Sequence, residues 1–145
     1  LSKNAILFSN NKNEFFSIDT KTGSVSWVQK INSNIRPTFI DNYIFTISME
    51  GFFIVMNSNT GEINRVTDIF DKISAKKRSK IKPVGFITGY EKIYLTTDNG
   101  RLYVINISTG KNILTLKFDN EIISKPFFSN KNLFILKENS IIKLN

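Results

Sequence analysis

The chain has 145 residues, no cysteine and no histidine, and a formal net charge of +8. The two missing residue types exclude disulfides, thiolate chemistry and imidazole-based metal sites or general bases within this segment. No run of apolar residues approaches the roughly 18 that a membrane-spanning helix needs, so no such helix is predicted.

Alternating apolar runs predict strands along the whole chain, and these strands fall into four successive groups. The groups cover residues 4–31, 36–69, 82–118 and 124–145. The two middle groups contain four strand candidates each and the outer two contain three, about 14 strands in all. Pro37, Pro83 and Pro126 each stand at the start of a group's first strand, where a missing N–H costs least. We therefore predict an all-β fold of four-stranded antiparallel sheets, the first of which lacks its inner strand and the last its outer one.

One short phrase recurs three times, always between the last two strands of a group. Its copies are Asp19-Thr-Lys-Thr-Gly23, Asn57-Ser-Asn-Thr-Gly61 and Asn106-Ile-Ser-Thr-Gly110. The Asx side chain can accept a hydrogen bond from a backbone N–H two residues on, and glycine allows a positive φ. The structural positions are Asp19, Thr22 and Gly23; Asn57, Thr60 and Gly61; and Asn106, Thr109 and Gly110. Self-similarity at this period predicts a repeat architecture, and strands as the repeating unit predict propeller blades.

The second interval between these phrases is lengthened by a basic stretch. Residues 71–82 read DKISAKKRSKIK, with six basic residues and one acid. We interpret this stretch as an exposed, mobile loop inserted between two blades. It lacks the interleaved aromatic residues that nucleic-acid binding requires, so no nucleic-acid partner is predicted. Lys76, Lys77, Arg78 and Lys80 could dock an acidic partner patch or an anionic head-group surface, and the alternative is a flexible insertion of no special purpose.

The first copy of the phrase extends to Ser17-x-Asp19-x-x-Thr22-Gly23-x-x-x-Trp27. This pattern resembles the tryptophan-docking motif of the pyrroloquinoline-quinone (PQQ)-like repeat family of β-propellers. The resemblance implies that the indole of Trp27 packs between neighbouring blades and that its N–H finds a backbone acceptor. Arg65 and Leu114 fill the tryptophan position in the later copies, which is similar to non-enzymatic members. The implied fold is a partial β-propeller that does not close into a ring within this chain.

The last third of the chain carries a narrower resemblance. It rests on the run from Lys92 to Asn106, on Thr109-Gly110, on Ser124-Lys-Pro126 and on the run from Leu133 to Asn145. Together these resemble the C-terminal part of the propeller lipoproteins of the bacterial outer-membrane β-barrel assembly machinery. That resemblance implies a genuine C terminus at Asn145 and a larger parent protein with the missing strands upstream.

A protein of that family is a non-enzymatic interaction scaffold without cofactors, on the periplasmic side of the outer membrane. The implied partners are the central barrel-assembly subunit and unfolded outer-membrane proteins. Membrane association would come only from a lipid anchor outside this chain.

Two other functions share the fold. A PQQ-dependent dehydrogenase would hold the quinone with calcium, which needs several convergent oxygen ligands. The carboxylates here are scattered over turns and strand ends, so we expect a solvated surface instead: Asp19, Asp41, Glu50, Glu62, Asp98, Asp119 and Glu138. An extracytoplasmic or lumenal sensor propeller would continue into a transmembrane helix.

Overall fold

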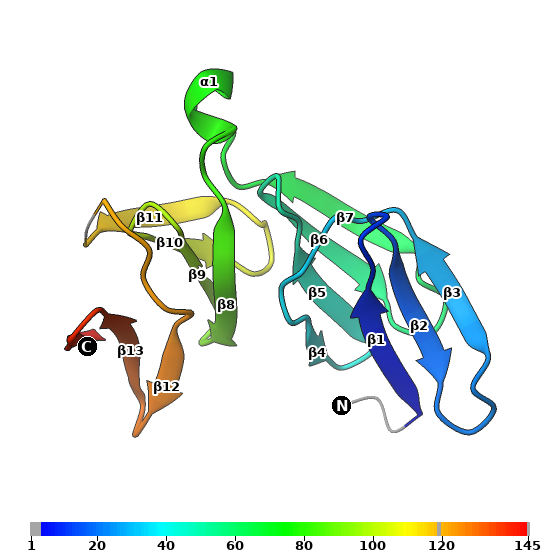
Figure 1. Ribbon diagram of the computed structural model, residues 1–145. Coiled ribbons are helices and arrows are strands. Elements are labelled where there is room, and N and C mark those ends of the chain that lie inside the picture. The colour runs from blue at the N-terminus through cyan, green and yellow to red at the C-terminus, as the bar shows by residue number, and fades with distance from the viewer. Residues whose placement is uncertain (1–3, 119, 145) are drawn as a thin grey trace. The chain divides into compact units, whose positions relative to one another are not determined.

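The computed structural model describes residues 4–118 and 120–144, which form 14 strands in four antiparallel sheets (Figure 1). This confirms the predicted all-β fold class, with two four-stranded sheets and two three-stranded ones. The sheets group into two compact units, residues 1–67 and 68–145. Asp119 and Asn145, which were considered above, lie outside the described residues.

The first unit contains two sheets. Its three-stranded sheet has the order β1-β2-β3, and its four-stranded sheet has the order β4-β5-β6-β7. The strands are β1 (Ala5–Ser9), β2 (Phe15–Asp19), β3 (Val25–Gln29), β4 (Thr38–Ile40), β5 (Tyr43–Ile47), β6 (Phe52–Asn57) and β7 (Ile63–Asp68). Four consecutive residues are buried in both β5 and β6, so these middle strands are covered on both faces, whereas the edge strand β7 has no buried residue.

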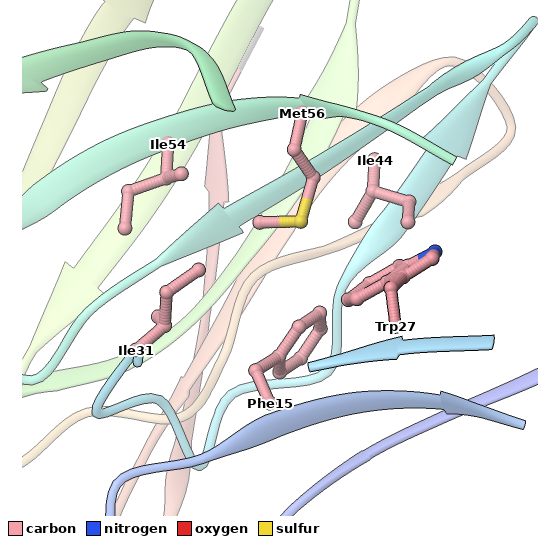
Figure 2. Packing of buried hydrophobic residues seen from close by; sticks show 6 residues of the cluster. All are labelled: Phe15, Trp27, Ile31, Ile44, Ile54 and Met56. Atoms are coloured by element: carbon pink, nitrogen blue, oxygen red, sulfur yellow. The ribbon is translucent and has the colours of Figure 1, made fainter. Parts of the chain in front are cut away.

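The core of the first unit joins its two sheets. One side is contributed by Phe15 and Trp27, and the other by Ile44, Ile54 and Met56, whose side chains point toward the two rings (Figure 2). The ring centroids of Phe15 and Trp27 are 6.0 Å apart. Complete burial of side chains of this size contributes about 1.5–3 kcal/mol each, so this cluster fixes the packing of one sheet on the other.

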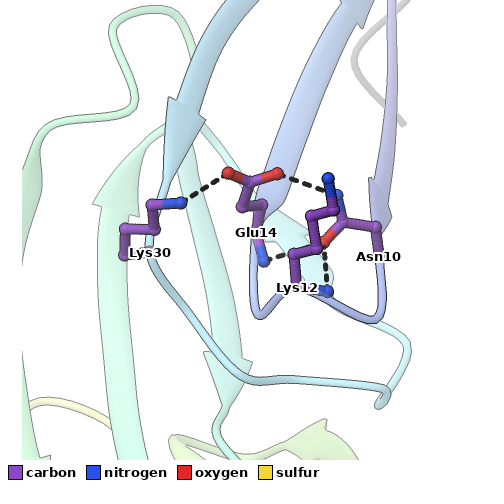
Figure 3. Close-up of polar contacts among 4 residues, drawn as sticks. All are labelled: Asn10, Lys12, Glu14 and Lys30. Carbon is purple, nitrogen blue, oxygen red and sulfur yellow. Dashed lines mark hydrogen bonds and ion pairs between the residues drawn. The ribbon is translucent and has the colours of Figure 1, made fainter.

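A polar cluster closes the turn between β1 and β2. The Asn10 side-chain oxygen accepts the backbone N–H groups of Lys12 and Glu14, at 2.9 and 3.1 Å (Figure 3). The Glu14 carboxylate accepts hydrogen bonds from the Lys30 ammonium and the Asn10 amide. Lys30 first, and Asn10 second, hold the pKa of Glu14 below its usual value.

The second unit also contains one four-stranded and one three-stranded sheet, and here the four-stranded sheet comes first along the chain. Its four-stranded sheet has the order β11-β10-β9-β8, and its three-stranded sheet has the order β12-β13-β14. The elements are α1 (Ala75–Arg78), β8 (Pro83–Gly89), β9 (Lys92–Thr97), β10 (Arg101–Asn106), β11 (Asn112–Lys117), β12 (Phe127–Ser129), β13 (Asn132–Lys137) and β14 (Ser140–Leu144). Leu102, Ile123, Leu133 and Ile135 form the buried core between the two sheets.

The inserted segment differs from the irregular loop that we expected. Residues 75–78 form one turn of helix, α1, and Ile81 at the end of the segment is only 6% exposed. Alanine, lysine and arginine are good helix formers, but a single turn is too short to show an apolar period, so the sequence carried no helix signal. The segment is therefore attached to its unit through Ile81, while all five of its lysines are exposed.

Candidate functional site

The three copies of the repeated phrase form corner turns with the same local geometry. In each copy the glycine N–H donates to the carbonyl of the Asx residue, at 2.9, 2.9 and 2.8 Å. The three glycines have φ of 71°, 72° and 72°, a left-handed conformation that favours glycine. These residues are Gly23, Gly61 and Gly110.

The polar side chains of the corners are also arranged alike. The oxygens of Asp19, Asn57 and Asn106 accept the backbone N–H of the motif threonine at 2.9, 3.2 and 2.8 Å. Each threonine hydroxyl in turn accepts the N–H two residues on, at 3.2 to 3.3 Å. At Asp19 the N–H groups of Thr22 first, and Lys21 second, hold the carboxyl pKa below its usual value. The side chains of the motif residues therefore form the hydrogen bonds that hold the turns, and this role is structural.

Trp27 attaches one sheet of the first unit to the corner turn of the next. Its indole N–H donates to the Ser58 carbonyl at 3.0 Å, and the side-chain amide of Gln29 donates to the Gly61 carbonyl at 2.8 Å. Trp27 is 8% exposed. This geometry matches the docking role that the resemblance implied for Trp27.

The two residues at the equivalent position behave differently from Trp27. Arg65 in β7 places its guanidinium carbon 5.3 Å from the ring centroid of Phe53, and burial lowers its pKa. Leu114 in β11 is 49% exposed and lines a cavity of about 350 Å³ between the two sheets of the second unit. Within the described part of the chain, the docking of a tryptophan on a neighbouring corner turn thus occurs once, at Trp27.

The four residues of the predicted basic patch, Lys76, Lys77, Arg78 and Lys80, have different surroundings in the structure. Arg78 turns back to pair with the Asp68 carboxylate, which also accepts the Phe70 N–H at 2.9 Å. Lys76 is exposed on the one-turn helix. Lys77 and Lys80 are also exposed, and they line a cavity of about 760 Å³ beside the helix. Of the four residues, two line this cavity, and Arg78 is engaged in an ion pair.

This cavity lies entirely within the second unit, and we call it the basic cavity. Four cations line it: Lys72, Lys77, Lys80 and Arg101. Its remaining lining combines one carboxylate, several uncharged polar groups and three isoleucines. These are Asp71, Ser74, Asn99, Tyr103, Asn112, Thr115, Ile69, Ile73 and Ile81. Its volume is in the range of cavities that hold ligands.

The lining of the basic cavity carries more positive than negative charge. Within residues 4–118 and 120–144, none of its four cationic side chains forms an ion pair. Burial raises the pKa of Tyr103, although the charge of Arg101 opposes that shift, so the phenol stays protonated as a donor at neutral pH. Asp71 is the one carboxylate in the lining, which leaves an excess of positive charge.

Sequence reasoning found only part of this cavity. Lys77 and Lys80 were predicted as a possible partner-binding loop, whereas Lys72, Arg101 and Tyr103 were not singled out. Arg101 and Tyr103 lie in β10, distant in sequence from the basic stretch. The alternation of side chains along β10 does not indicate which face of that strand lies near the inserted segment, so Arg101 and Tyr103 could not be assigned to the cavity from the sequence.

The described residues contain no group of three or more aspartate or glutamate side chains close enough to share a metal ion. Carboxylates are among the oxygen ligands that hard cations such as calcium take in proteins. The same described residues contain no helix that is long and apolar enough to cross a membrane.

A family model described as outer membrane protein assembly factor BamB matches residues 78–145. The match covers 68 of the 145 residues, slightly less than half of the chain. The resemblance inferred from the sequence is thereby confirmed for the C-terminal part of the chain. No curated protein sequence matches the chain.

Several solved structures have folds similar to that of this chain. BamB from Moraxella catarrhalis has a TM-score of 0.77 at 15% identity, covering 100% of this chain and 45% of that one. The β-propeller domain of Myceliophteria thermophila Cps50 (Swd1) has a TM-score of 0.69 at 12% identity, with coverages of 97% and 47%. The designed protein Ika4 has a TM-score of 0.76 at 14% identity, with coverages of 99% and 86%. At these identities the likeness shows the fold, a partial propeller, and this chain spans less than half the length of the BamB structure.

Proposed function

We propose that this chain is part of a non-enzymatic interaction scaffold that assists the assembly of outer-membrane β-barrel proteins. The observation that carries the proposal is the match of residues 78–145 to an outer membrane protein assembly factor. The similar fold of a BamB structure supports it. The proposed location is the periplasmic side of the bacterial outer membrane, with attachment through a lipid anchor outside this chain.

The arrangement of polar and apolar groups suits a scaffold. The motif residues hold corner turns through hydrogen bonds from both their side chains and their backbone, and the edge strands β7 and β11 present exposed side chains to solvent. Rigid sheets that display loops and edge strands offer surfaces on which a protein partner can lie. The proposed partners are the central barrel-assembly subunit and unfolded outer-membrane proteins.

Direct binding tests this proposal. The chain is immobilised and exposed to the purified periplasmic domains of the barrel-assembly subunit, and separately to a urea-unfolded outer-membrane protein diluted into buffer. We expect both to be retained, and an unfolded soluble protein of similar size and charge to be retained less. Each measurement is repeated at high salt, because a net charge of +8 attracts acidic proteins without specificity. Retention of the unfolded soluble protein to the same extent would contradict the proposal.

The non-enzymatic part of the proposal has its own test. The chain is incubated with calcium, pyrroloquinoline quinone and a panel of alcohols, and reduction of an artificial electron acceptor is followed. We expect no reduction above that of the quinone and calcium alone. Alcohol-dependent reduction that requires the chain would replace the scaffold proposal with the dehydrogenase.

A further inference from the structure

We propose that the basic cavity of the second unit binds an acidic, partly apolar segment of a protein partner in an extended conformation. This inference rests on the proposed scaffold function and names the chemistry of the segment that the scaffold would hold. It concerns Lys72, Lys77, Lys80 and Arg101, together with the polar and apolar groups between them.

The charge of the cavity is the first argument. Four cations face one space, and within the described residues none of the four has a carboxylate at ion-pair distance. Like charges held around one cavity repel each other, and an anionic ligand relieves that repulsion. By contrast, Arg78 of the same segment already pairs with Asp68 and therefore serves to position the segment.

The lining of the cavity is the second argument. Ile69 and Ile81 are 2% and 6% exposed and form apolar parts of the lining, with Ile73 beside them. The buried phenol of Tyr103 and the amide of Asn99 add hydrogen-bonding groups. A ligand that fits such a lining has both carboxylates and apolar groups, as a peptide with alternating acidic and aliphatic residues does.

The edge of the sheet supplies a place for the backbone of such a peptide. β11 is the terminal strand of its sheet, so one side of its backbone has no neighbouring strand in that sheet. Asn112 and Thr115 of β11 line the cavity, and the Asn112 amide donates to the Thr115 hydroxyl at 2.8 Å. An extended segment that lies along β11 would receive main-chain hydrogen bonds there and place alternate side chains in the cavity.

The same features favour a peptide over an isolated phosphate. Compact phosphate sites use several backbone N–H groups or a bidentate arginine to surround one anion. Here three of the four cations are lysines on an exposed segment, and they are spread around a cavity of about 760 Å³. Charges spread in this way match several carboxylates along a chain.

Fluorescence anisotropy with a short labelled peptide tests the inference. The peptide alternates glutamate with isoleucine and alanine, and a reference peptide carries glutamine in place of glutamate. We expect the 145-residue chain to bind the acidic peptide, more weakly as salt is raised, and to bind the reference peptide at least about tenfold more weakly. The cavity variant replaces four cations by glutamine: Lys72, Lys77, Lys80 and Arg101. We expect it to lose about tenfold in affinity for the acidic peptide, because each exposed pair contributes a modest amount.

A matched control separates the cavity from the net charge of the chain. The control variant also loses four charges, all from exposed lysines outside the cavity: Lys12, Lys21, Lys131 and Lys143. We expect its affinity to change less than about twofold once salt is present. A double variant, Lys77→Glu and Lys80→Glu, should instead prefer a peptide with lysine in place of glutamate. That preference cannot arise from an unfolded variant.

Three results would overturn the inference. The first is equal loss of affinity in the cavity and control variants. The second is binding of inorganic phosphate, or of phosphatidylglycerol vesicles, with the same dependence on the four cations while the acidic peptide does not bind. The third is equal binding of the acidic and glutamine peptides. None of these three results contradicts the scaffold proposal, which has its own binding test. If that test fails instead, peptide binding at the cavity can still be measured.

Discussion

The indole of Trp27 lies directly against Gly61, the glycine of the corner turn in the adjacent sheet of the first unit. A Cβ atom on Gly61 would lie 2.5 Å from Cδ2 of the indole, closer than such contacts occur. Trp27 Nε1 also donates to the Ser58 carbonyl of the same turn. Gly61 is thus required twice, by its positive φ and by the ring above it.

We expect Gly61→Ala to destabilise the chain more than Gly23→Ala. Both glycines have a φ near +70°, where alanine costs about 1–2 kcal/mol. A Cβ on Gly23 would contact nothing within 4 Å, whereas one on Gly61 would collide with Trp27 and add about 1–3 kcal/mol. Urea unfolding followed by the fluorescence of the single tryptophan measures both variants. Equal losses would show that Trp27 can move away from Gly61 at no cost.

Trp27→Phe tests the docking of the indole separately. The substitution removes the hydrogen bond to the Ser58 carbonyl, worth about 0.5–1.5 kcal/mol, and part of the contact with Phe15 and Met56. We expect a loss of about 2 kcal/mol or more, measured by urea unfolding with far-ultraviolet circular dichroism. The matched control is Leu114→Phe at the equivalent position of β11, which is 49% exposed. There we expect a change within about 0.5 kcal/mol.

Most of the fold could be predicted from the sequence because each local signal repeats. The Asx-x-x-Thr-Gly phrase sets a turn by itself, through Asp19, Asn57 and Asn106, so three copies located three equivalent corners. The strands β4 and β12 begin slightly later than predicted, at Thr38 and Phe127. Pro37 and Pro126 precede them, whereas Pro83 is itself the first residue of β8, so a missing N–H shortens the start of a strand at two of the three prolines.

The candidate site was less accessible to sequence reasoning. The basic stretch could be recognised in the sequence, but the different roles of its cations could not. The ion pair of Arg78 with Asp68, for example, depends on how the segment folds back. The contribution of Arg101 depends on which face of β10 the segment covers. Non-local placement of this kind leaves no periodic pattern in the sequence.

We expect Arg78→Gln to loosen the inserted segment, whereas Lys76→Gln should not. Arg78 pairs with Asp68 and its side chain is 23% exposed, while Lys76 faces solvent. After allowance for solvent screening, the pair should contribute about 1 kcal/mol. Hydrogen exchange of residues 71–82 should accelerate in the Arg78 variant and remain unchanged in the Lys76 variant.

A double-mutant cycle assigns that effect to the pair. Asp68→Asn keeps an oxygen that can accept the Phe70 N–H, so the single substitution removes mainly the charge. The losses from Arg78→Gln and Asp68→Asn should then be less than additive in urea unfolding, since each removes the same interaction. Full additivity would mean that Arg78 acts through other contacts.

We expect Asp19→Asn to make the stability of the chain less dependent on pH in the acid range. The N–H groups of Thr22 and Lys21 hold the Asp19 pKa below its usual value of 3.8, so the folded pKa is lower than the unfolded one. The resulting stability is complete above the unfolded pKa and is lost as pH falls through the folded pKa. Asparagine keeps the turn, as Asn57 and Asn106 do in the other copies, but does not titrate. Urea midpoints measured from neutral to acid pH should therefore fall more for the parent chain than for the variant, and a carbon-13 titration of the Asp19 carboxyl should give a folded pKa below 3.8. Parallel curves for the two proteins would show that the turn hydrogen bonds are as favourable to the protonated carboxyl as to the carboxylate.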